Sequence, residues 1–188
     1  RLGLCPAQYQ IIAGTSVNDP AFDATNGLKD LWAYYGYGSA AGLSKLAEVP
    51  EMLHRTGMAF DDLVAALRTR FLNPELFSVP PPSNLVQIQF PAAPTEDACD
   101  VSEMTLTNLD SDPGFAQDWL GRLHRFIRLW RALGWQIGDV DRAVAVVGGT
   151  LDSAAPDKLA AVKEVVEALD RPVGALLGMW APLDTWGE

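Results

Sequence analysis

The organisation of this chain follows from the segment Leu123-His124-Arg125-Phe126-Ile127-Arg128-Leu129-Trp130-Arg131-Ala132-Leu133-Gly134-Trp135. It predicts the end of a long amphipathic helix, a glycine stop and the start of a second helix. Asp112 is a favourable N-cap and Pro113 suits the first helical position, so the long helix is expected to begin there. Gly134 ends it, because glycine adopts the left-handed C′ conformation without a steric penalty. The predicted apolar face comprises Trp119, Leu120, Leu123, Phe126, Ile127, Trp130 and Leu133.

Arginine occupies every third position in the second half of this helix, from 122 to 131. On a helix of 3.6 residues per turn, a step of three rotates the row by about 60° per arginine, so the row spirals and forms no flat patch. The chain has a formal net charge of −10, which repels a phosphate backbone. We therefore expect a solvated or salt-bridged face and no nucleic-acid partner. The arginines are Arg122, Arg125, Arg128 and Arg131.

The 188 residues suffice for a sizeable core in one or two domains. No apolar run approaches the roughly 20 residues of a membrane span. The chain begins with Arg1 and shows no signal peptide, which leads us to expect either a processed product or, as the preferred interpretation, an excised piece of a longer protein. Cys5 and Cys99 either pair or remain free and partly buried, and the low cysteine count favours free thiols.

Apolar periodicity predicts a mainly α fold, an irregular multi-helix bundle of helix-turn-helix units with a small β-ribbon insertion. The helix over 155–169 is expected to turn Leu159, Val162, Val165, Val166 and Leu169 inward. Helices are expected over 3–14, 28–36, 39–46, 50–57, 60–73, 112–134, 137–148, 155–169 and 172–182.

The sequence divides into residues 1–78, a first helical part, 79–111, a Pro- and acid-rich linker, and 112–188, a second helical part, which together are expected to pack as one unit. In the linker, residues 85–90 and 104–109 alternate apolar and polar side chains, which predicts two short strands. The segment between them is too long for a tight hairpin, but the strands can still pair as a ribbon that packs on helices.

One local pattern recurs along the chain. Gly57, Gly134 and Asp170 are each followed by apolar residues three, six and ten positions later, and Gly3 begins a degraded copy. Each copy predicts a helix-turn-helix unit in which the turn residue sets the direction of the second helix. The spacing between copies is irregular, so no regular solenoid is expected. The alternative, that any all-α protein repeats such turns, stays open.

No sequence motif for catalysis or ligand binding is present. His54 and His124 lack metal-site spacing, and there is neither a G-x-S-x-G elbow nor a phosphate-binding loop. Each histidine is expected to be packed or on the surface. The acidic runs 97–100 and 110–112 fit no twelve-residue EF-hand frame. We predict a non-enzymatic protein with no catalytic, cofactor-binding or metal-binding residues.

Several stretches resemble the N-terminal helical region of Tc toxin A components, the insecticidal toxin complexes. The similarity runs in order over nearly the whole chain. It is strongest over 120–135, and Asp141 stands where the family usually keeps an acid. These are packing motifs, so they identify the family better than they identify a site. The other similar stretches are Leu31-Trp32-Ala33-Tyr34-Tyr35-Gly36-Tyr37 and residues 49–63, 70–74, 176–180 and 183–187.

The resemblance implies a structural role in a pore-forming virulence factor. In that family the A component is a very large secreted protein that forms a bell-shaped homopentamer, with a helical shell around a central channel. A pH change opens the shell, and the channel enters the host membrane to pass a toxin held by the B and C components. This chain would be a shell segment. Its implied partners are other domains of the parent chain, neighbouring protomers and, indirectly, the B and C components, with membrane contact only through other regions.

A second hypothesis is a non-catalytic protein–protein interaction module of a toxin-related protein that has lost the injection machinery. An unrecognised hydrolase is a residual third. The acidic composition adds the hypothesis that crowded carboxylates, whose pKa values are raised by like charge, take part in the pH response.

Overall fold

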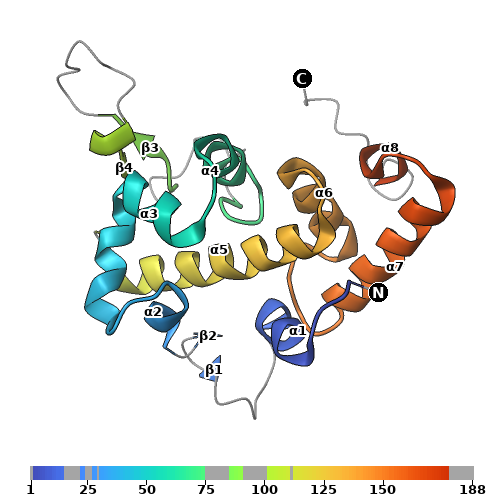
Figure 1. The fold of residues 1–188 in the computed structure, drawn as a ribbon, viewed down its shortest axis with the longest axis horizontal. Helices are drawn as coiled ribbons and strands as arrows, with labels where there is room; N and C mark the ends of the chain where they lie inside the picture. The colour runs from blue at the N-terminus through green and yellow to red at the C-terminus, as the bar shows by residue number, and fades with distance from the viewer. Residues whose placement is uncertain are drawn as a thin grey trace. The chain divides into compact units, whose positions relative to one another are not determined.

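The computed structural model describes residues 2–14, 22–23, 27–28, 30–74, 85–90, 101–110 and 112–177. These residues form a mainly helical fold with small two-stranded sheets, which confirms the predicted fold class (Figure 1). The elements are α1 (Pro6–Ala13), β1 (Phe22–Asp23), β2 (Gly27–Leu28), α2 (Leu31–Tyr34), the 3-10 helix η1 (Ala40–Ala47), α3 (Val49–Thr56), α4 (Phe60–Leu67), β3 (Ile88–Gln89), the 3-10 helix η2 (Val101–Glu103), β4 (Thr105–Leu106), α5 (Pro113–Leu133), α6 (Ile137–Val147), α7 (Ala155–Leu169) and α8 (Val173–Leu177).

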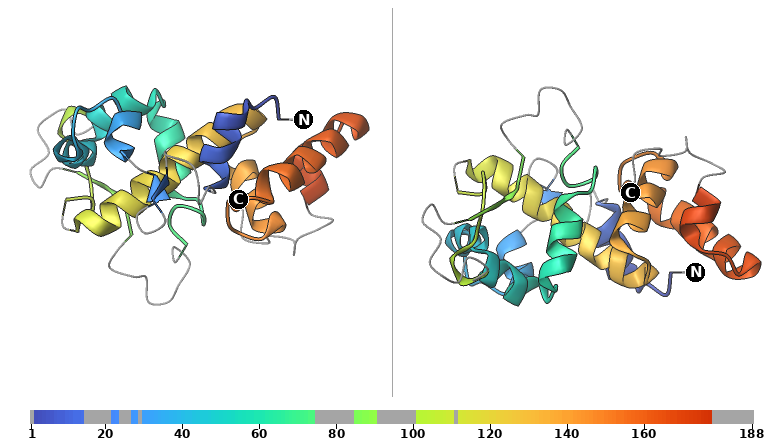
Figure 2. Two further views of the ribbon diagram at one scale, coloured as in Figure 1. Left: turned by 90° about the horizontal axis from the view of Figure 1, so that it is seen from below. Right: turned by 90° about the horizontal axis from the view of Figure 1, so that it is seen from above.

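The chain forms two compact units. Unit 1 comprises Arg1–Phe22 and Arg125–Glu188, and unit 2 comprises Asp23–His124. This division differs from the three stretches expected from the sequence, because α5 contributes its first half to unit 2 and its second half to unit 1. In unit 1, α1 packs on α7, and α6, α7 and α8 contact one another (Figure 2). In unit 2, α3 contacts both 3-10 helices, and η1 also contacts α2 and β4.

The central helix begins and ends as predicted. Asp112 caps it, because its Oδ1 accepts hydrogen bonds from the backbone N–H groups of Gly114 (2.8 Å) and Phe115 (3.2 Å). Gly134 follows the last turn with φ +71°, the left-handed conformation that stops the helix. The predicted face is buried except at Trp130, which is half-buried, and its least exposed members are Trp119, Leu120, Leu123 and Phe126.

The recurrent turns share one backbone conformation. Gly57, Gly134 and Asp170 have φ values of 63°, 71° and 48°, and Gly3 has 68°. The apolar residues after the first three turns are largely buried, so the turn sets the direction in which the next helix docks its apolar side. These buried residues are Leu63, Leu67, Ile137, Val140, Val144, Val173 and Leu176.

The linker strands pair as predicted, over a shorter length. β3 and β4 are antiparallel, with Ile88 opposite Leu106 and Gln89 opposite Thr105. Leu106 is 2 % exposed, so the ribbon packs its apolar side inward while its edge meets η1 and α3. A backbone hydrogen bond of 3.0 Å from the Val49 N–H to the Met104 carbonyl joins the ribbon to α3.

Two expected helices have different bounds. Leu28 lies in β2, because Asp30 adopts φ 53° and a helix can begin only after it. The helix expected over 60–73 ends at Leu67. After it, the side chains of Thr69 and Asn73 donate hydrogen bonds to the carbonyls of Ala66 and Leu67, which would otherwise accept from the next helical turn. The helix expected over 172–182 is described from Val173 to Leu177, and the remainder lies outside the described residues.

Two burial predictions were wrong. Along α7, Leu159 is fully buried, but Val165 is 37 % and Leu169 54 % exposed, because no described element covers the second half of this face. Cys5 is free and exposed instead of partly buried. Its potential partner Cys99, the acidic run 97–100 and the closing motif 183–187 lie outside the described residues.

Candidate functional site

Segments that carry the family resemblance come together in unit 2 through hydrogen bonds from side chains to backbone carbonyls. They span residues 31–37, 70–74 and 120–124. We call Tyr35, Asn73, Arg122 and His124 the motif hub: Tyr35, Arg122 and His124 make contacts between these segments, and Asn73 links one of them, 70–74, to Leu67 and Val86.

Tyr35 connects the end of α2 to the middle of α5. Its side chain is 3 % exposed, and its hydroxyl donates a hydrogen bond of 2.8 Å to the Leu120 carbonyl. Burial raises the pKa of Tyr35, so the hydroxyl remains a donor at any physiological pH. The ring of His124 lies on the same side of α5, with its centroid 5.0 Å from that of Tyr34 and 5.7 Å from that of Tyr35. These aromatic contacts add to the packing of α2 on α5.

Arg122 holds the loop after α4. Its Nη1 donates to the carbonyls of Phe71 and Leu72, each at 3.3 Å. Its Nε lies 3.2 Å from Asp118 Oδ2, a charge contact without the geometry of a hydrogen bond. The predicted salt-bridged role of the arginine row is therefore correct for Arg122, whose guanidinium also donates hydrogen bonds to two carbonyls of the loop after α4.

Asn73 closes the other end of this loop and is 2 % exposed. Its Nδ2 donates to the carbonyls of Leu67 (2.7 Å) and Val86 (3.0 Å), and its Oδ1 accepts from the Val86 N–H at 3.2 Å. One side chain thus satisfies the end of α4 and both backbone groups of a residue that precedes β3. From sequence, Asn73 was predicted only as a helix terminator, because its partner Val86 is thirteen residues away.

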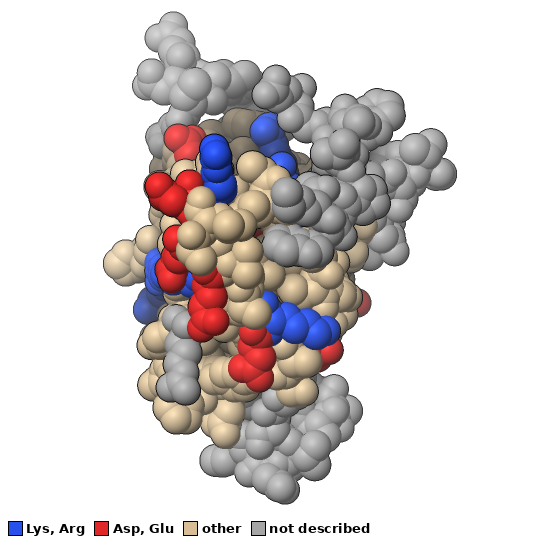
Figure 3. All heavy atoms as spheres, turned by 90° about the vertical axis from the view of Figure 1, so that its right-hand side faces the viewer, with Lys and Arg blue, Asp and Glu red and all other residues tan. Residues whose placement is uncertain are grey.

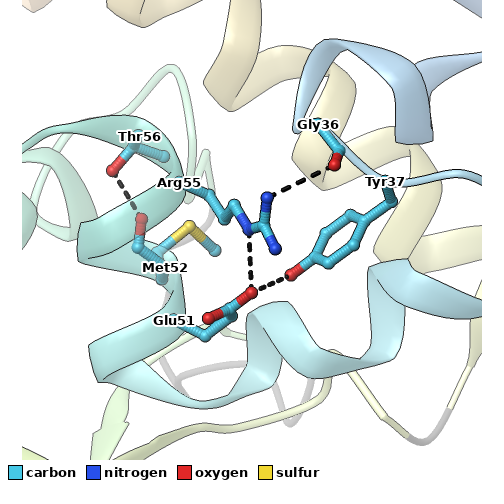
Figure 4. A network of polar contacts seen from close by, with 6 residues as sticks. All are labelled: Gly36, Tyr37, Glu51, Met52, Arg55 and Thr56. Carbon is cyan, nitrogen blue, oxygen red and sulfur yellow. Dashed lines mark hydrogen bonds and ion pairs between the residues drawn. The ribbon is translucent and has the colours of Figure 1, made fainter.

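A second group of polar side chains lies at the surface between the turn after α2 and helix α3 (Figure 4). Glu51 Oε1 accepts hydrogen bonds of 2.8 Å from both Arg55 Nε and the Tyr37 hydroxyl. The Arg55 guanidinium lies 4.4 Å from the centre of the Tyr37 ring, a cation–π distance, and its Nη1 donates to the Gly36 carbonyl at 3.3 Å. We call Tyr37, Glu51 and Arg55 the surface cluster.

The surface cluster shifts the titration of its members. Hydrogen bonds from Arg55 and then Tyr37 lower the pKa of Glu51. Partial burial and the hydrogen bond to Glu51 raise the pKa of Tyr37 to about 12. Glu51 is therefore an anion and Tyr37 a neutral donor at physiological pH, a pairing that fixes the turn and supplies neither a general acid nor a general base near neutrality.

Glu51→Gln is expected to destabilise the protein in a pH-dependent way. Because the folded-state pKa of Glu51 is lowered, its stabilisation is present above the ordinary value of 4.5 and is lost as the pH falls through the lowered pKa. The Tm difference between wild type and E51Q should be largest near neutral pH and should close below pH 4.5. Arg55→Gln provides the control: on that background, E51Q should show a weaker pH dependence. A constant Tm difference across the acid range would contradict the assignment.

Tyr35→Phe is expected to destabilise unit 2 by about 1 kcal/mol, because it removes one buried hydrogen bond and keeps the ring. Chemical denaturation measures the difference. Tyr37→Phe is the matched variant. Its effect should be smaller, because the Tyr37 hydroxyl is only partly buried and its acceptor, the Glu51 carboxylate, is accessible to solvent. Equal effects of the two substitutions would show that burial of the Tyr35–Leu120 bond adds no stability.

The remaining features predicted from the sequence are the two histidines, the other arginines of the row and the absence of metal or membrane signals. His54 is exposed on α3, and His124 is half-buried in the motif hub. Arg125 departs from the solvated row, since its Nε donates to the Ile12 carbonyl at 2.9 Å. Across the described ranges, no three His, Cys, Asp or Glu side chains gather in a way that could hold a metal ion. None of the described helices combines the length and apolar character of a membrane span.

The described residues form a helical protein, and the side chains of the motif hub bond backbone groups of the same unit. Comparison with protein-family models, with curated proteins and with solved structures gave no match.

Proposed function

We propose that this chain is a structural helical-shell segment of a Tc-like toxin A component, a pore-forming translocation machine. The observation that supports the proposal is the use of the resembling motifs. Tyr35 and Arg122 donate hydrogen bonds to backbone carbonyls of other motif segments. Their presence in the sequence is therefore accounted for by a structural role in holding helices together. A shell segment requires such residues, whereas a catalytic site requires polar groups that face a substrate.

The proposed role is non-catalytic. The donors of the motif hub contact main-chain carbonyls within unit 2, and in the surface cluster Glu51 and Tyr37 are held far from the titration range of a neutral acid–base pair. In the parent protein the proposed partners are other domains of the same chain and neighbouring protomers of a homopentamer, with the B and C components reached indirectly. The proposed location is extracellular, by resemblance alone.

Electron microscopy of the full parent protein at neutral, raised and lowered pH tests this function. The expected result is a bell-shaped pentamer that releases a needle when the pH changes. Unit 1 and unit 2, fitted separately into the map, should both lie in the shell and outside the channel. Small monomeric particles that do not respond to pH would overturn the proposal and favour the alternative, an interaction module of a toxin-related protein.

A further inference from the structure

The two outer edges of the β3–β4 ribbon differ. The outer edge of β4 is closed by the start of α3, where Glu48 forms a β-bridge with Thr105 and the Val49 N–H donates to the Met104 carbonyl at 3.0 Å. On the other side, β3 is the last strand of this sheet among the described residues. Within the described ribbon, the outer edge of β3 is therefore where backbone groups can pair with a further strand.

The direction of the backbone groups along β3 follows from its pairing with β4. Gln87 faces β4, because the Thr107 N–H donates to its carbonyl at 2.9 Å. In an antiparallel pair this orientation alternates from one residue to the next. The N–H and carbonyl groups of Val86, Ile88 and Phe90 therefore face the outer edge.

The side chain of Asn73 occupies the first position of this edge. Its Oδ1 accepts from the Val86 N–H at 3.2 Å and its Nδ2 donates to the Val86 carbonyl at 3.0 Å, the two bonds that a neighbouring strand would make. In the part of the chain that the structure describes, no residue makes the corresponding bonds to Ile88. Phe90, the next residue that faces this edge, has the most exposed large apolar side chain of the described residues, at 57 %. The edge thus has two open positions, Ile88 and Phe90.

The sequence of this strand lacks the features by which edge strands avoid association. The segment Leu85-Val86-Gln87-Ile88-Gln89-Phe90 contains no charged residue, no proline and no glycine. A lysine, a proline or an inward-pointing charge commonly prevents contact at an edge. Uncharged segments of this length with β-branched and aromatic residues pair readily with copies of themselves. The open edge therefore favours an uncharged extended strand as its partner, and a second copy of the chain presents one.

We propose that two copies of this chain pair through the outer edge of β3, antiparallel and about a twofold axis at Gln89. In this register the Ile88 backbone of each copy exchanges two hydrogen bonds with Phe90 of the other, so both open positions of each copy are used. Each Ile88 side chain then lies opposite a Phe90 ring, a β-branched–aromatic pair that covers the exposed ring. Asn73 keeps its bonds to Val86. The two Gln89 side chains, which are exposed in the single chain, meet at the axis.

The expected dimer is weak. Two short strands bury less than the roughly 1,000 Å² of a stable interface. Each copy also has a net charge of −10, and acidic side chains form a row on the face shown in Figure 3. Salt screens the repulsion between exposed charges, so added salt should strengthen the association. The inference is independent of the proposed function, because a cyclic pentamer is closed by heterologous contacts and this contact is isologous.

Sedimentation velocity of the full 188-residue chain tests the pairing. The wild type should form a dimer whose fraction rises with protein concentration and with salt. Gln89→Lys and Gln89→Glu each place like charges opposite one another, with Cβ atoms about 5 Å apart, and each should weaken dimerisation about fivefold. An equimolar mixture of Q89K and Q89E places opposite charges at the axis, so a mixed dimer should recover at least the wild-type affinity.

Gln87→Lys is the matched control. Gln87 is exposed on the same side of the strand, but its two copies would lie about 14 Å apart across the axis, beyond the Debye length of about 8 Å at physiological ionic strength. This variant should dimerise within about twofold of the wild type. Because both positions are exposed, the variants should fold as the wild type does, which circular dichroism checks.

Several results would overturn the proposal. A chain that stays monomeric at every concentration and salt would leave the edge to an extended segment of another protein. Association that Q87K and Q89K weaken equally, or that the mixture of Q89K and Q89E fails to restore, would place the contact on another surface. Species larger than a dimer would show that the contact is not a closed twofold pairing.

Discussion

Asn73→Ala is expected to lower the free energy of unfolding of unit 2 by about 2 to 4 kcal/mol, because it leaves buried backbone groups without partners. The amide makes three hydrogen bonds, two to the Val86 backbone and one to the Leu67 carbonyl. Alanine makes none of them, so the Leu67 carbonyl and both backbone groups of Val86 lose the Asn73 amide as a partner. Denaturant unfolding measures the loss, and the effect should appear without a change of secondary-structure content.

Two further variants separate lost hydrogen bonds from lost packing. Asn73→Asp keeps the size of the side chain but turns an oxygen toward the carbonyls of Leu67 and Val86, so it should destabilise at least as much as alanine near neutral pH. Asn108→Gly, which removes a partly buried amide bonded to the Leu85 carbonyl at 2.8 Å and keeps a φ of 64° accessible, should have a smaller effect. If N73A and N108G proved equal, the hub role of Asn73 would be refuted.

Elements defined by neighbours in sequence were predictable. Asp112 and Gly134 delimit α5 as expected, since an N-cap and a left-handed stop act within a few residues. The recurrent turn was also visible, because a turn residue and an apolar strip are both local signals. Alternation predicted the two strands of the ribbon, whereas their antiparallel pairing and register required the structure.

Features that depend on distant contacts were not predictable. Helix α4 ends at Leu67, where the side chains of Thr69 and Asn73 bond the carbonyls of Ala66 and Leu67, and the Asn73 side chain also bonds the backbone of Val86. No pattern within the helix predicts these contacts. The periodicity of α7 indicates an apolar side but not how much of it is covered, so Leu169 was wrongly expected to face inward. Arg125 looked like part of a solvated row, since its partner Ile12 is 113 residues away. In the motif hub, the resemblance identified the segments, whereas the bonds between them required coordinates.

Gly14→Ala is expected to destabilise unit 1 by about 2 to 4 kcal/mol, more than a left-handed glycine normally contributes. Gly14 ends α1 with φ +62°, and a Cβ there would lie 2.6 Å from Arg125 Nη2 and 2.7 Å from its Cζ. A free arginine would move aside at little cost. This one is held, because its Nε donates to the Ile12 carbonyl at 2.9 Å and its Nη2 donates to the Leu151 carbonyl. The added methyl group must therefore break hydrogen bonds that tie α1 to the loop before α7.

Gly134→Ala is the matched control, because Gly134 has φ +71° and no atom within 4 Å of an added Cβ. It measures the backbone strain alone, about 1 kcal/mol, so the excess loss in G14A reports the arginine contact. Arg125→Ala removes the same hydrogen bonds directly. On that background, G14A should cost only what G134A costs, since the methyl group no longer displaces a guanidinium. Equal losses for G14A and G134A in the wild-type background would mean that Arg125 yields freely, and that its bonds to Ile12 and Leu151 do not hold α1 in place.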